Sequence, residues 1–206
     1  MAKIKVMLVD DHAMLRMGLA SLLATTKDLE VVAEAGGGAE AIEKYAAANP
    51  DVVVMDLMMP EMDGTETTRR ILKDHPDAKV LILTTFGTAD ALGHALKAGA
   101  LGAILKTAKL PELVKYITSV AAGKRSVTPE IEQILTENPP VQELSKRQSE
   151  ILESMTRGLS NEDIAAMLGI SVPMVKEHIK LIFEKIGAAN RAEAVAIAIK
   201  KHLLKV

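Results

Sequence analysis

Apolar runs and segments of helical period alternate through residues 1–123 of the chain. The apolar, often β-branched runs lie at residues 3–9, 29–34, 51–55, 79–84 and 102–106. The amphipathic segments that follow them span 13–24, 39–48, 64–73, 89–98 and 111–122. This alternation predicts a doubly wound α/β fold with a five-stranded parallel sheet. Because the strands are almost continuously apolar, we expect helices on both faces of the sheet.

The last third of the chain has a helical pattern with a polar cap before each helix. The expected helix starts are Ser145, Ser160, Ser171 and Asn190, and the expected ends are Gly158, Gly169 and Gly187. The final helix is expected to run from Arg191 to about His202. The segments Asn161–Leu168 and Val172–Ile186, joined by a short turn, predict a helix-turn-helix.

The two patterns are separated by a stretch of linker composition. ENPPVQ at 137–142 contains two prolines, and TPEIEQIL at 128–135 is compatible with a short helix. We therefore predict an α/β domain at 1–123, a linker at 124–143 and a small all-α domain at 144–206.

Composition excludes several classes of protein. The chain has 206 residues and no cysteine, which rules out disulfides, cysteine-based zinc sites and thiol catalysis. No signal-peptide pattern is present, and no stretch approaches the roughly 20 apolar residues of a membrane span. We therefore expect a cytoplasmic protein that does not bind membranes. Residues 1–123 carry 13 basic and 16 acidic residues, whereas 145–206 carry 10 basic and 7 acidic ones. The positive C-terminal balance permits nucleic-acid binding without requiring it.

Polar side chains stand at the carboxyl ends of four predicted strands. Asp10 and Asp11 end the first strand, Asp56 the third, Thr84 the fourth and Lys106 the fifth. In doubly wound folds these ends form the edge where ligands bind. Clustered acids repel one another unless a cation neutralises them, and ligand sets made of oxygen atoms suit Mg²⁺. With a hydroxyl and an amine beside them, these acids predict a phosphoryl-acceptor site in which Asp56 is the nucleophile.

Each of these residues has a simpler explanation when it is considered alone. A single aspartate after a strand is usually a cap or a turn residue, Thr84 alone is a β-branched strand residue, and Lys106 alone is a solvated loop lysine. Other phosphate chemistries fit less well. The chain has no G-x-x-x-x-G-K-[ST] loop, and its acids are adjacent, not spaced D-x-D as in a haloacid-dehalogenase-type phosphatase. The coincidence at four strand ends favours the phosphoryl acceptor.

The α/β region resembles the flavodoxin-like receiver domain of two-component response regulators. The matching motifs are VDDH (9–12), DLMMPEMDG (56–64), LTT (83–85) and the lysine of AILK (103–106). The resemblance implies that a sensor histidine kinase phosphorylates Asp56 in the presence of Mg²⁺. It further implies that the metal is bound by Asp11 directly, by Asp10 through water, and by Asp56 and the carbonyl of Met58. Thr84 and Lys106 would contact the phosphoryl group.

One departure from the family pattern concerns the switch. Ala103 stands where receivers usually have tyrosine or phenylalanine, and the chain has no aromatic residue between Phe86 and Tyr116. We therefore expect the change at Thr84 to pass through Phe86 and the loop up to Thr88. A weakly coupled switch also implies appreciable dimerisation and DNA binding without phosphate.

Residues 144–195 resemble the LuxR/FixJ/NarL-type output domain. The matching motifs are GLSNEDIA, VKEH, KIG and NRAEAV. The resemblance implies that Lys176, Glu177 and Lys180 face the major groove of double-stranded DNA. A two-fold DNA site and a homodimer follow from symmetry. Pro173 and Met174 replace the usual pair of small hydroxyl residues, so one phosphate contact is expected to be missing.

These observations predict a phosphorylation-activated response regulator and DNA-binding transcription factor, which is not an enzyme. Two alternatives stay open from sequence alone. In the first, the helical domain binds another protein instead of DNA. In the second, the α/β domain is a small phosphatase or another hydrolase.

Overall fold

The structure, a computed structural model, describes residues 3–85, 89–201 and 203 of the chain. The chain forms two compact units, Met1–Pro139 and Pro140–Val206. Within the described residues, no helix is both long enough and apolar enough to cross a membrane.

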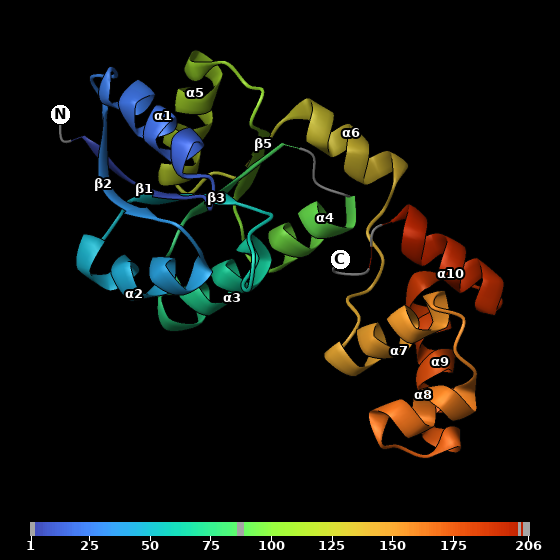
Figure 1. The fold of residues 1–206 in the computed structure, drawn as a ribbon. Helices are drawn as coiled ribbons and strands as arrows, with labels where there is room; N and C mark the ends of the chain where they lie inside the picture. The colour runs from blue at the N-terminus through green and yellow to red at the C-terminus, as the bar shows by residue number, and fades with distance from the viewer. Residues whose placement is uncertain (1–2, 86–88, 202, 204–206) are drawn as a thin grey trace. The chain divides into compact units, whose positions relative to one another are not determined.

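The first unit is a parallel sheet between two layers of helices. The strands are β1 (Ile4–Val9), β2 (Leu29–Ala35), β3 (Val52–Asp56), β4 (Val80–Thr84), β5 (Gly102–Leu105) and β6 (Ser126–Val127). The helices are α1 (Ala13–Ala24), α2 (Gly38–Ala48), α3 (Gly64–Asp74), α4 (Ala89–Lys97), α5 (Leu110–Ala121) and α6 (Pro129–Glu137). The strand order is β2-β1-β3-β4-β5-β6, and α1 and α5 cover one face while α2, α3 and α4 cover the other (Figure 1). The predicted doubly wound fold is confirmed.

The central strands contribute to two hydrophobic cores, one on each face of the sheet. In β3, Val53 and Met55 belong to one core, whereas Val52 and Val54 belong to the other. All four are buried because helices cover both faces. This double burial accounts for the absence of apolar–polar alternation in the strand.

The prediction of five strands is wrong by one, because β6 lies in the stretch that the sequence predicts to be a linker. Ser126 and Val127 pair in parallel with Gly102 and Ala103 of β5. A strand of two residues is too short to give a periodic signal. Gly102 allows the close approach, since a Cβ atom there would lie 2.3 Å from the carbonyl oxygen of Ser126. The short helix expected near 128–135 is present as α6, and it packs into the first unit.

The second unit is all-helical, with α7 (Lys146–Thr156), α8 (Asn161–Leu168), α9 (Val172–Ile186) and α10 (Arg191–Lys200). Ser145 and Ser160 form capping boxes with Gln148 and Asp163, as their spacing suggests. Gly169 has φ +65° and turns the chain from α8 into α9. The last helix ends at Lys200, and position 202 lies outside the described residues.

Candidate functional site

Four of the polar residues predicted to form the site lie at neighbouring strand ends, and Asp10, Asp56 and Thr84 are buried. Asp10 follows β1, Asp56 ends β3, Thr84 ends β4, and Lys106 follows β5. The Lys106 ammonium nitrogen lies 2.7 Å from Asp10 Oδ2 and 2.8 Å from Asp56 Oδ2, and its side chain is only 7% exposed. The strand order places β3 between β1 and β4, so the two carboxylates come from adjacent strands. One buried lysine therefore bridges the two acids.

The pKa values in the site reflect burial and this bridging. Burial raises the pKa of the Asp56 carboxyl; the bond from Lys106 opposes that effect, and the nearby Asp10 charge adds to it. For Lys106, burial alone lowers the pKa, but the bonds to Asp10 and Asp56 outweigh burial and raise it. Lys106 is thus held in its charged form between the carboxylates.

The acidic cluster fits a divalent cation. Asp10, Asp11, His12 and Asp56 each offer a ligand atom, and these atoms lie within 4.8 Å of one another. Asp11 Oδ1 is shielded from solvent and makes no hydrogen bond among the described residues, although His12 Nδ1 lies 3.0 Å away. With one ammonium facing several carboxylates, negative charge remains for a metal to offset. Carboxylate donors of this kind suit Mg²⁺.

The backbone around Asp56 explains why a turn follows this strand at once. The N–H of Gly64 donates to the Leu57 carbonyl at 2.9 Å, which closes the loop between β3 and α3. A Cβ atom at Gly64 would lie 2.2 Å from the Asp56 carbonyl oxygen, so only glycine fits there. Asp63 then caps α3 by accepting from the Glu66 N–H at 2.9 Å. The Met58 N–H lies 3.4 Å from Asp56 Oδ1, and the proposed role of the Met58 carbonyl stays a prediction.

One residue that supports the site was not singled out from the sequence. Arg16, on α1, donates to the Asp10 carbonyl oxygen and lies 3.4 Å from Glu34 on β2. It therefore ties the end of β1 to α1 and β2. The available signal was an arginine in a mostly apolar helix, four residues after His12.

Thr84 is completely buried, and its hydroxyl has no hydrogen-bond partner among the described residues. A buried hydroxyl without a partner is costly, and the contact of Thr84 with a phosphoryl group stays a prediction. Phe86, which the sequence suggests as the carrier of the switch, lies outside the described residues, as does the rest of 86–88.

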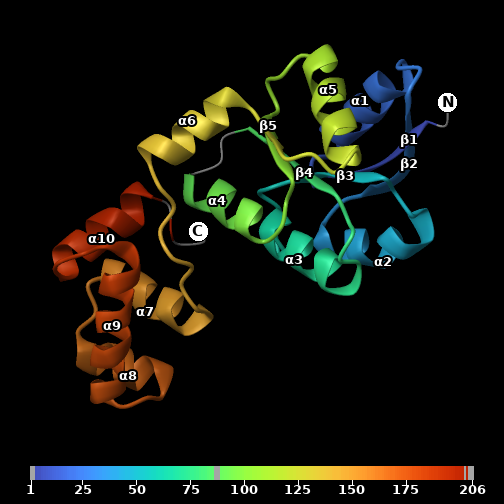
Figure 2. The same cartoon turned by 180° about the vertical axis from the view of Figure 1, so that it is seen from behind.

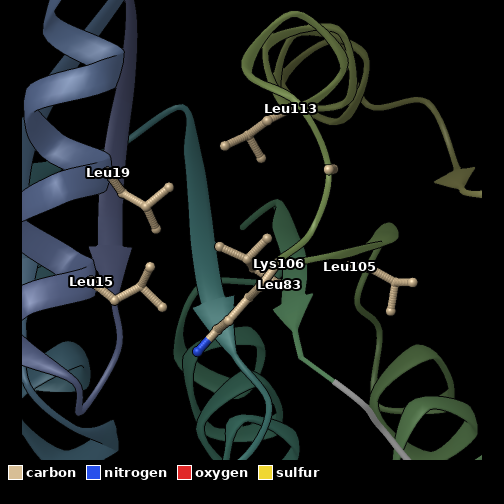
Figure 3. A pocket seen from close by; sticks show the side chains of 7 residues that line it. Leu15, Leu19, Leu83, Leu105, Lys106 and Leu113 are labelled. Atoms are coloured by element: carbon tan, nitrogen blue, oxygen red, sulfur yellow. The ribbon is translucent and has the colours of Figure 1, made fainter.

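A small cavity surrounds the stem of Lys106 between α1 and α5. Its volume is about 30 Å³, and its lining residues are Leu15, Leu19, Leu83, Leu105, Lys106, Ala108 and Leu113. Figure 3 shows Leu15 and Leu19 facing Leu113 across it, with the Lys106 amine directed toward the end of β3. The cavity is too small for an organic ligand. Its apolar walls pack the lysine stem and leave the ammonium directed at the acids.

The three predicted DNA-contacting residues share the exposed face of α9. Lys176, Glu177 and Lys180 are exposed, whereas Val175 and Ile182 are buried in the core of the second unit. Lys180 lies 4.0 Å from Glu184, an exposed pair of little energetic weight. The helix therefore presents a polar face, and its contact with DNA stays a prediction.

Comparison with known families accounts for both units. Residues 6–118 match the response regulator receiver domain, and residues 142–198 match the bacterial regulatory proteins of the luxR family. The chain is a LuxR-type response regulator. Response regulators of this kind combine a receiver with a LuxR-type DNA-binding domain and act as transcription factors, not enzymes, so the hydrolase alternative is set aside.

The similarity of this response regulator to known relatives extends over its whole length. It is 36% identical over 209 residues to the transcriptional regulatory protein LiaR of Bacillus subtilis (strain 168), covering 98% of this chain and 99% of LiaR. It is 37% identical over 207 residues to the response regulator protein VraR of Staphylococcus aureus (strain NCTC 8325 / PS 47), with coverages of 98% and 99%. The crystal structure of the response regulator ChrA, from a heme-sensing two-component system, matches with 39% identity and a TM-score of 0.59, covering 99% of this chain and 100% of ChrA.

Proposed function

We propose that Asp56 of this response regulator accepts a phosphoryl group from a sensor histidine kinase, and that this modification changes dimerisation and DNA binding. The observation that carries the proposal is Lys106, bonded to both Asp10 and Asp56 at buried strand ends. An Asp56 carboxylate oxygen attacks the phosphorus of the kinase phosphohistidine. A P–O bond forms, the P–N bond breaks, and the released imidazole nitrogen takes a proton.

The neighbouring side chains would act on the transferred group. Asp10, Asp11, Asp56 and the Met58 carbonyl would hold Mg²⁺, which offsets negative charge on the phosphoryl group when it is bound. The Lys106 ammonium, already 2.8 Å from Asp56, would pair with a phosphoryl oxygen. The unpaired Thr84 hydroxyl would donate to another.

For the second unit, we propose that α9 enters the major groove and that Lys176, Glu177 and Lys180 contact DNA. Support comes from their exposure on one face and from the excess of 10 basic over 7 acidic residues in 145–206. A structure of RcsB from Salmonella enterica serovar Typhimurium, bound to promoter rprA in the presence of the phosphomimetic BeF3⁻, is 25% identical with a TM-score of 0.64, covering 95% of this chain and 98% of RcsB. A homodimer on a two-fold DNA site and a cytoplasmic location complete the proposal.

The test is labelling by acetyl phosphate and Mg²⁺, followed by intact-mass analysis. The native chain should gain one phosphoryl group, and Asp56→Asn should gain none. Asp51→Asn is the matched control, because Asp51 is exposed and lies just before the same strand as Asp56. Among the described residues its carboxylate accepts the N–H of Lys5 on β1. A phosphoryl adduct that persists in Asp56→Asn would move the acceptor to another residue.

A further inference from the structure

Contacts between neighbouring residues connect the proposed phosphoacceptor, Asp56, with α6, and the first of these residues is Thr84. Asp56 pairs with Leu83 across β3 and β4, so Thr84 is the next residue along the neighbouring strand. Its buried hydroxyl has no hydrogen-bond partner among the described residues, which is unfavourable. A phosphoryl oxygen on Asp56 would accept a hydrogen bond from this hydroxyl. Phosphorylation would therefore favour movement of the Thr84 side chain toward Asp56.

Ala103 lies on the same face of the sheet, one strand further from Asp56. Thr84 pairs with Leu105, and Ile82 pairs with Ala103. Residues two apart in a strand point to the same face, so Thr84 and Ala103 are diagonal neighbours on that face. Ala103 is completely buried in the core that also contains Ile131 of α6. Its methyl group has no rotamers, so it cannot absorb a shift of its neighbours by turning away.

The junction of β5 with β6 and α6 is made by few bonds. Ala103 pairs with Val127, and the Thr128 N–H donates to the Ala103 carbonyl at 3.2 Å. Thr128 occupies the N-cap position of α6, but its hydroxyl makes no capping bond and is buried without a partner among the described residues. A helix that lacks its capping bond is less stable at its start. The start of α6 lacks a capping bond, and the completely buried Ile131 anchors the helix in the core that contains Ala103.

Helix α6 also connects the site to the rest of the chain. It packs against α4 as well as β5, and Figure 2 shows it beside both. Only Asn138 and Pro139 separate its last residue, Glu137, from the second unit at Pro140. A change in the docking of α6 is thus delivered directly to the segment that leads into the DNA-binding unit.

We propose that α6 reports the phosphorylation state of Asp56. Movement of Thr84 toward the phosphoryl group changes the packing around Ala103, and this changes the docking of β6 and α6 on β5. The proposal rests on the proposed phosphorylation of Asp56, and its route runs through described residues, whereas the expected route through Phe86 stays a prediction.

The first experiment is hydrogen exchange on the full chain with Mg²⁺, with and without beryllofluoride. Coupling between two sites is commonly a factor of about 5–150, so we expect exchange of the amides of α6 to change roughly fivefold or more. Helix α2, which makes none of these contacts, should not respond. Unchanged exchange in α6, in a chain that acetyl phosphate labels on Asp56, would overturn the proposal and leave the proposed function intact. Absence of labelling would instead overturn the proposed function.

The second experiment weakens the packing of Ile131 of α6 in the core that contains Ala103. Ile131→Ala should speed exchange of α6 without beryllofluoride and remove most of its further response, while labelling of Asp56 stays as in the native chain. Ile131→Val, which removes one methyl group, should give a smaller effect and serves if the alanine variant folds poorly. Gln133→Ala is the control, because Gln133 is exposed and its side chain donates to Glu137 on the same helix. A full native response in both Ile131 variants would overturn the proposal.

Discussion

Lys106 faces two buried carboxylates, so one positive charge in the site is paired with two negative charges. When all three groups are ionised, their charges sum to −1. Burial accordingly raises the pKa of Asp56 even though Lys106 bonds to it. Asp56, the proposed acceptor, is therefore expected to destabilise the fold in the absence of metal, as is common where function requires a reactive group.

The stability of the metal-free protein should show this cost. Because the folded pKa of Asp56 is raised above its usual 3.8, the unfolded chain releases this proton more readily. The favourable contribution of Asp56 to folding is present below that usual pKa and is lost as pH rises through the folded pKa. We expect Asp56→Asn, in EDTA, to melt at a higher temperature than the native chain near pH 7, with the difference shrinking on acidification toward pH 4.

Calorimetry over that pH range is the measurement, and Asp51→Asn is again the control because its carboxylate is exposed. Addition of Mg²⁺ should raise the melting temperature of the native chain more than that of Asp56→Asn. A native chain that is more stable than the variant at neutral pH without metal would contradict this account of Asp56.

At the scale of elements, long periodic segments could be predicted from the sequence and the short junction could not. β3 was predictable because four buried apolar residues precede Asp56, and the caps Ser145 and Ser160 mark α7 and α8. β6 has two residues and depends on the close approach at Gly102, which is a tertiary contact without a sequence period. The residues of the proposed site could be predicted from the sequence because parallel strands bring their carboxyl ends together. The bond from Arg16 to a backbone carbonyl could not be predicted, because no sequence motif marks it.

The exposed face of α9 gives a prediction for DNA binding. Lys176→Ala or Lys180→Ala should weaken binding by about 1–3 kcal/mol with relaxed sequence preference if the lysine contacts a base. If the lysine contacts only a phosphate, binding should fall uniformly and the salt slope should decrease by about one. Gel shifts with selected and random duplexes across a salt series distinguish these results.

Lys146→Ala is a suitable comparison, because this exposed lysine begins α7 and lies outside the helix-turn-helix. Unchanged DNA binding in the Lys176→Ala/Lys180→Ala double variant would remove α9 from the interface and favour a protein partner for this unit.

At the scale of the whole molecule, we propose that an exposed apolar stripe on α10 contacts a second copy of the chain. Ala194 and Ala198 are buried in their own unit, which leaves Ala192, Ala196 and Ile199 exposed. These three residues are spaced by four and three, so they form one stripe on the helix. Ile199 is 64% exposed, and small neighbours allow another helix to approach closely.

We expect Ile199→Glu to weaken dimerisation, both with beryllofluoride and in the smaller dimeric fraction expected without it. Sedimentation equilibrium measures both fractions, and Lys200→Glu, at the next exposed position, controls for the added charge. A native chain that is strictly monomeric without beryllofluoride would count against the expected dimerisation and DNA binding in the absence of phosphate. Unaltered dimerisation of Ile199→Glu would place the contact elsewhere.

The short strand β6 also affects where the gene of such a protein can be cut and rejoined to a different output domain. A fragment that ends at Gly123, after α5, would leave the edge of β5 unpaired and would uncover the core position of Ile131. Bare strand edges invite pairing with other chains. A recombination event at Gly123 would therefore give an aggregation-prone fragment. One between Pro139 and Pro140 would leave each compact unit whole. A junction between these prolines would therefore keep every residue of the first compact unit, including β6 and α6, when a different output domain is joined.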